Sequence, residues 1–193
     1  MIGCAVWCAR EERDDPCDTD GMIEPDTKDW TWVITRRCPE CGFDGATVSH
    51  TAVAGRIRAD AAEWPLRLGA DDVTERPKPA VWSALEYGCH IRDVHRIFNQ
   101  RVALMLAEDE PRFPNWDQDA TAIEDDYGAQ DPAVVAAELV DAAGAVADAY
   151  DRVPSDAWGR RGLRSNGSEF TIASIAVYHL HDIVHHAHDV DHG

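Results

Sequence analysis

The chain has 193 residues, of which 45% are hydrophobic, and its formal net charge at pH 7 is −18. This length and apolar content are enough for one globular domain with a hydrophobic core. The acidic excess argues against nucleic acids and anionic membranes as partners, because both carry negative charge. A small-molecule substrate is therefore the expected partner.

Targeting signals are not visible in the sequence. No apolar run approaches the ~20 residues of a membrane-spanning helix, and the N-terminus lacks the basic and apolar regions of a signal peptide. We therefore expect a cytoplasmic protein. Its six cysteines are then expected to be mostly reduced thiols rather than a disulfide framework.

Residues 1–28 differ in composition from the rest of the chain. Their charged run from Glu11 to Pro16 has no periodicity, so we expect a disordered extension, followed by one domain over residues 29–193. Met22 is an alternative start of translation. The aromatic and β-branched run Trp30–Thr35 is typical of a short extended segment that lies on a core.

The sequence Cys38-Pro39-Glu40-Cys41-Gly42 has the spacing of half a zinc knuckle. A second pair at matching spacing is absent, although Cys4 and Cys8 are candidates to complete the site. A redox pair is another interpretation, but no βαβ pattern surrounds the segment. The favoured interpretation is a tight turn before the first helix, with two partly buried thiols.

Four amphipathic helices are expected, over about residues 49–68, 84–107, 132–152 and 172–190. Ser83 and Glu86 have the spacing of a capping box at the start of the second helix. Asp131 precedes a proline at the first position of the third, which is a strong start signal. Four such helices with connections of mixed length predict an all-α protein, a four-helix bundle with a short extended N-terminal segment.

Two long connections separate these helices. Residues 108–131 are rich in Asp and Pro and suit a loop that covers a pocket, with a short helix near residues 120–126. Residues 153–168 are expected to be a loop and contain Arg160, Arg161 and Arg164. This basic cluster is either surface charge paired with acidic residues or a site that captures an anion beside a pocket.

Five of the nine histidines lie within thirteen residues of the last helix. His181 and His185 are four residues apart and point the same way, so one helix can offer two imidazoles to one metal ion. His90, on the inward side of the second helix, is the candidate for a third ligand. When the last helix is viewed along its axis, at about 100° per residue, Asp182 and His186 fall on the side opposite the apolar residues, which is expected to face solvent.

These residues carry a family resemblance, because the chain resembles the DinB-like superfamily over about residues 49–190. The segment from Trp82 to His90 is similar to the family's segment with the first metal-binding histidine, and the segment from His181 to His185 is similar to its closing motif. The resemblance implies that His90, His181 and His185 bind one divalent ion, zinc or nickel, with water in the remaining positions. Some relatives use a glutamate in place of one histidine.

The superfamily includes mycothiol-dependent maleylpyruvate isomerases and thiol S-transferases. The resemblance therefore implies an S-transferase or isomerase that uses a mycothiol-type thiol, held as thiolate by the metal, on a small electrophile. A metal- or ligand-binding bundle without turnover is the alternative, a metal hydrolase is a third interpretation, and a homodimer stays open. Asp93, one turn after His90, either orients that imidazole or pairs with Arg96 along the helix.

Overall fold

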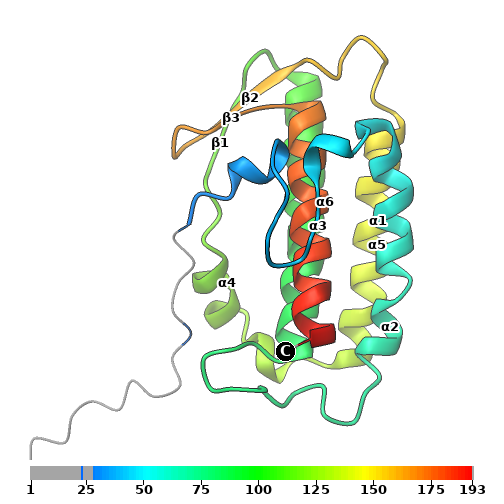
Figure 1. Cartoon of the computed structure of the whole chain (residues 1–193), viewed down its shortest axis with the longest axis vertical. Coiled ribbons are helices and arrows are strands. Elements are labelled where there is room, and N and C mark those ends of the chain that lie inside the picture. The colour runs from blue at the N-terminus through cyan, green and yellow to red at the C-terminus, as the bar shows by residue number, and fades with distance from the viewer. Residues whose placement is uncertain (1–22, 24–27, 193) are drawn as a thin grey trace, which may run out of the picture.

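The computed structural model describes residue 23 and residues 28–192, and Figure 1 shows how its elements are arranged. The bundle consists of α1 (Val53–Ala61), α3 (Ala84–Ala107), α5 (Pro132–Asp151) and α6 (Ile172–His192). α3 and α1 each pack against both α5 and α6. The predicted four-helix bundle is confirmed. The extension expected over residues 1–28 lies outside the described residues, apart from positions 23 and 28.

Two of the predicted helix starts are formed by the expected side chains. The backbone N–H of Glu86 donates to Ser83 Oγ at 3.2 Å, and the N–H of Ser83 donates to Glu86 Oε2 at 2.8 Å. α5 begins at Pro132, and the carboxylate of the preceding residue, Asp131, accepts the N–H of Ala133 at 2.8 Å. Short-range hydrogen bonds thus determine where both helices begin.

The first predicted helix is not continuous. Residues 49–68 divide into a 3-10 turn, η3 (His50–Ala52), then α1, then the short α2 (Trp64–Arg67). Pro65 explains the break, because its ring has no N–H and clashes with the carbonyl four residues earlier, at Ala61. The indole of Trp64 donates to Asp60 at 3.1 Å and is fully buried, which holds the two pieces against the same core.

The segment before α1 also differs from the prediction. In place of the extended run expected at Trp30–Thr35, Thr31–Ile34 forms the 3-10 helix η1, and Gly45–Thr47 forms η2. The carboxylate of Asp29 accepts the N–H of Thr31 at 2.9 Å, which favours a turn over a strand. Val33 is fully buried, and η1 packs on α6.

The two long connections contain regular structure. A small sheet has the order β1 (Arg112–Phe113), β2 (Arg161–Arg164) and β3 (Glu169–Thr171); β1 and β2 are parallel, and β2 and β3 are antiparallel. The loop expected at residues 153–168 therefore contains a strand. The short helix expected near residues 120–126 is α4 (Gln118–Glu124), and η4 (Tyr127–Ala129) follows. The described residues include no helix long and apolar enough to cross a membrane.

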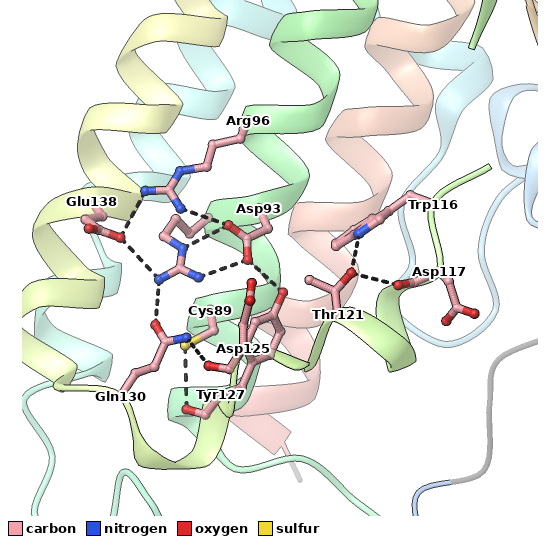
Figure 2. A network of polar contacts seen from close by, with 11 residues as sticks. Cys89, Asp93, Arg96, Trp116, Asp117, Thr121, Asp125, Tyr127, Gln130 and Glu138 are labelled. Carbon is pink, nitrogen blue, oxygen red and sulfur yellow. Dashed lines mark hydrogen bonds and ion pairs between the residues drawn. The ribbon is translucent and has the colours of Figure 1, made fainter. Parts of the chain in front are cut away.

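A partly buried polar network joins α3 to α5 and η4 (Figure 2). Asp93 accepts hydrogen bonds from Arg92, from Arg96 and, at 2.7 Å, from the hydroxyl of Tyr127. Glu138 on α5 accepts from both arginines. Burial alone would raise the pKa of Asp93, but the hydrogen bonds from Arg92 and Tyr127 outweigh it and lower the pKa. The interpretation of Asp93 as a partner of Arg96 is confirmed.

Candidate metal centres

α6 presents potential metal ligands to two different neighbours. The ligand atoms of Asp182 and His186 cluster with that of His90 on α3, and those of His181 and His185 cluster with two thiols of the segment before α1. Residues four apart share a helix face, whereas adjacent residues point about 100° apart. Two overlapping pairs at this spacing therefore serve two separate clusters.

The first cluster consists of His90, Asp182 and His186, whose ligand atoms lie within 4.8 Å of one another. Asp182 Oδ1 is 3.7 Å from Nε2 of His90 and 3.4 Å from Nε2 of His186. His90 is fully buried, and neither of its ring nitrogens has a hydrogen-bond partner among the described residues. An unsatisfied buried polar group costs about 1–3 kcal/mol, so the arrangement fits a bound cation that accepts a nitrogen lone pair.

The charges of this cluster also suit a cation. Burial lowers the pKa of His90, which keeps its imidazole in the neutral form that binds metals. Burial alone would lower the pKa of His186 too, but hydrogen bonds to Asp182 and Asp189 raise it to about 9. Burial would raise the pKa of Asp182, yet His186 and His90 hold it well below its usual range. Two carboxylates thus surround a single imidazolium, whose positive charge a metal ion can replace.

Aromatic rings hold His90 in place. The indole of Trp116 stacks on it at 5.4 Å with an interplanar angle of 10°, and Trp82 lies 5.3 Å away. Trp116 in turn donates from Nε1 to Thr121 Oγ1 at 2.8 Å, within α4 (Figure 2). The long connection after α3 therefore covers the cluster, as expected for a loop of this length.

The second cluster consists of Cys38, Cys41, His181 and His185, whose ligand atoms also lie within 4.8 Å of one another. Nδ1 of His185 is 3.9 Å from Cys38 Sγ. Burial lowers the pKa of His181 to about 4 and raises the pKa of the Cys41 thiol to about 11. The indole of Trp30 covers both imidazoles, at ring distances of 5.6 and 5.1 Å.

The structure thus divides the three histidines that the sequence grouped together. His90 lies with Asp182 and His186, while His181 and His185 lie with the cysteines. That the three histidines bind one ion stays a prediction. The expectation that Asp182 and His186 face solvent is wrong, because α3 and the connection after it cover that face and leave the side chains only 26% and 18% exposed. The four-residue spacing of Asp182 and His186 was the signal that could have identified them.

A cleft of about 80 Å³ lies between the two clusters. It is lined by Trp30, Gln118, Tyr178, His181, Asp182, His185 and His186. Three of these residues, Trp30, Gln118 and Tyr178, also line a wider and more polar hollow of about 330 Å³. The hollow therefore adjoins the cleft that both clusters line.

The three arginines of the basic cluster have different roles. Arg160 donates to the backbone carbonyls of Met105 and Glu108 at the end of α3. Arg161 forms surface ion pairs with two glutamates, as one interpretation of the cluster expected. Arg164 lines the polar hollow, where Asn166 and Ser168 hold its guanidinium at 2.9 and 3.0 Å. Among the three, Arg164 is therefore the candidate for anion capture.

Comparisons with known proteins agree with this architecture. The sequence model of the DinB superfamily matches residues 55–190. The fold is similar to YfiT from Bacillus subtilis, described as a probable metal-dependent hydrolase with an unusual four-helix bundle topology. The TM-score is 0.61 at 20% identity, over 72% of this chain and 81% of that one. No curated protein sequence matches the chain. On the family match and the shared bundle, the chain belongs to the DinB superfamily.

Proposed function

We propose that this protein is a metal-dependent enzyme whose divalent ion is held by His90, Asp182 and His186. The observation that carries the proposal is the fully buried His90, whose two ring nitrogens find no hydrogen-bond partner within the described part of the chain. Two imidazoles and one carboxylate leave coordination positions open, as catalytic zinc sites do. Zinc or nickel is the expected ion, because both accept imidazole ligands.

The surrounding side chains prepare these ligands. His186 Nδ1 lies 2.9 Å from Asp189 Oδ2, so the other nitrogen, Nε2, is directed toward Asp182. A carboxylate behind an imidazole fixes its tautomer and makes it a better ligand. The stacked indole of Trp116 likewise fixes the orientation of the His90 ring.

The first candidate chemistry is transfer or isomerisation with a low-molecular-weight thiol of the mycothiol type. A divalent ion at this site would lower the pKa of a bound thiol or water. The adjoining hollow of about 330 Å³, with Arg164 in its wall, offers a place for a small polar electrophile or for polar groups of the thiol. The family resemblance supports this chemistry over other reactions of a bound thiolate.

The second candidate is hydrolysis by a metal-bound water. The observation that favours it is the carboxylate of Asp182, because two histidines and a carboxylate form the ligand set of several zinc hydrolases. The likeness to YfiT, described as a probable metal-dependent hydrolase, supports the same reaction class. A bundle that binds metal without turnover is the remaining alternative.

Metal analysis and paired activity assays distinguish these functions. The purified full chain is analysed for bound metal, then assayed with monochlorobimane and a panel of thiols that includes mycothiol, and separately with ester and amide substrates. Metal-dependent conjugation lost in His90→Ala supports the transferase, and metal-dependent hydrolysis without a thiol supports the hydrolase. Unchanged metal content in both His90→Ala and Asp182→Asn would contradict the assigned ligands. A metal-loaded protein inactive in every assay would support the non-catalytic alternative.

A further inference from the structure

We propose that Cys38, Cys41, His181 and His185 form a second, closed zinc site that fastens the segment before α1 to α6. Two thiols and two imidazoles are a common ligand set of structural zinc sites. Here they come from two parts of the chain that are 147 residues apart at Cys38 and His185. The inference is independent of the proposed function, because it uses different ligands.

The backbone of the cysteine segment has the tight turn that a zinc knuckle requires. The N–H of Cys38 donates to the carbonyl of Phe43 at 2.7 Å, and the N–H of Gly42 donates back to the carbonyl of Cys38 at 3.0 Å. Gly42 has φ +75°, a left-handed conformation that glycine adopts without steric cost. Arg37 and Asp44 pair as an antiparallel bridge on either side of the turn. The turn thus presents both thiols to α6.

The two imidazoles have the surroundings of metal ligands. His181 is 4% exposed, and its Nε2 is buried without a hydrogen-bond partner in residues 28–192. His185 directs Nδ1 toward Cys38, while its Nε2 lies 3.4 Å from Glu40 Oε2. In metal sites the second ring nitrogen of a ligating histidine characteristically faces a carboxylate. Glu40, between the two cysteines, therefore completes the site from outside the ligand shell.

The distances also suit zinc. Zn–S bonds of about 2.3 Å and Zn–N bonds of about 2.0 Å in a tetrahedron separate neighbouring ligand atoms by about 3.3–3.8 Å. The separation of 3.9 Å between Cys38 Sγ and His185 Nδ1 needs only a small movement to match. The alternative, a redox pair of cysteines, leaves the buried Nε2 of His181 unexplained.

The consequence of such a site is mechanical. Four protein ligands fill a tetrahedral zinc ion, so the site would be structural rather than catalytic. The ion would hold the turn at residues 38–43, and with it η1, against the outer face of α6. It would thereby keep Trp30 in the wall of the cleft that leads to the other cluster.

Cobalt substitution tests this site on the full chain. Metal-free protein is titrated with Co²⁺ and its absorption followed, because cobalt bound by thiolates gives charge-transfer bands that nitrogen and oxygen ligands do not. We expect two equivalents to bind to the wild type, with a thiolate signal. Cys38→Ser/Cys41→Ser should bind one equivalent without that signal. His90→Ala should lose the other equivalent and keep the signal, and so separates this site from the proposed catalytic one.

Matched variants and a second method keep the outcome decisive. Cys89→Ser, which alters a buried thiol elsewhere on α3, should keep the signal. If the double variant does not fold, X-ray absorption of zinc-loaded His90→Ala, which retains both thiols, should show two sulfur and two nitrogen ligands. A zinc environment of nitrogen and oxygen alone, or a wild type without the thiolate signal, would overturn the proposal. So would a folded double variant that binds two equivalents.

Discussion

The carboxylate of Asp182 lies 3.7 Å from Nε2 of His90, across the interface between α6 and α3. The residue before Asp182, His181, belongs to the other cluster, with Cys38 and Cys41. Adjacent positions on one helix therefore contribute to two centres. Substitutions one residue apart should have separable effects on metal content.

Single substitutions should divide the metal ligands into two sets. We expect His90→Ala, Asp182→Asn and His186→Ala each to remove one equivalent, and His181→Ala and His185→Ala to remove the other. Fewer protein ligands hold the ion less tightly, so affinity should fall sharply. His188→Ala is the matched control on the same helix and should change neither. Bound metal is measured by elemental analysis. Loss of the same single equivalent in His90→Ala, His181→Ala and His185→Ala would instead show that the three histidines share one ion.

Metal binding at the His90 centre should weaken as the pH falls below about 9. The pKa of His186 is raised from 6.5 to about 9, so in the metal-free protein this imidazole is protonated at neutral pH and must lose its proton to bind. Apparent affinity should fall about tenfold per pH unit below that value. Zinc titration of His181→Ala across pH 6–10 isolates this centre. An affinity that stays constant until the pH falls to about 6.5, the pKa of a free histidine, would contradict the raised pKa.

Asp93 should matter for stability and not for metal binding. Replacing it with Ala removes one of the two carboxylates that pair with the buried Arg92 and leaves the hydroxyl of Tyr127 without its acceptor. Because Glu138 still pairs with Arg92, we expect a loss of about 3 kcal/mol of unfolding free energy. Tyr127→Phe removes one hydrogen bond to the same carboxylate and should cost only about 1–2 kcal/mol. Urea unfolding of the metal-loaded proteins measures both. If a folded Asp93→Asn variant lost metal, Asp93 would be orienting a ligand after all.

Arg164 should affect substrate binding if an anionic group of the substrate or thiol lies in the polar hollow. We expect Arg164→Gln to raise KM about tenfold with little change in kcat, since a hydrogen bond from a charged group is worth about 1.5–3 kcal/mol. Arg161→Gln, three residues away on the same strand, is the control and should leave KM unchanged. Thermal melting of each variant checks that Asn166 and Ser168 still hold the strand end. Equal KM values for all three proteins would remove Arg164 from the site.

Gly42 should be needed for the turn that presents the thiols. Gly42→Ala places a side chain at φ +75°, which costs about 1–2 kcal/mol, and it should weaken cobalt binding at the cysteine cluster. Gly144→Ala is a matched control in α5, where an added Cβ meets no described atom within 4 Å, and it should stabilise the helix slightly. An unchanged melting temperature and cobalt affinity in Gly42→Ala would show that the turn tolerates the strain.

Much of the bundle could be predicted because its signals are local. The apolar periodicity and the capping residues Ser83 and Asp131 act within a few positions, so the starts of α3 and α5 were found. The break before α2 also had a local signal, Pro65, which the periodicity outweighed. The strands had no local signal. β2 pairs with β1, about fifty residues earlier, and strands this short have little sequence pattern of their own.

The same distinction applies to the metal-binding residues. Helical geometry, which follows from the sequence, already determines that His181 with His185, and Asp182 with His186, are two pairs on neighbouring faces of α6. What each pair meets is decided by packing between distant segments. α3 brings His90 to one face, and the turn before α1 brings Cys38 and Cys41 to the other. The sequence by itself therefore determined that α6 carries two pairs of potential ligands, and only the tertiary structure decided which other side chains join each pair, because that grouping depends on contacts between distant parts of the chain.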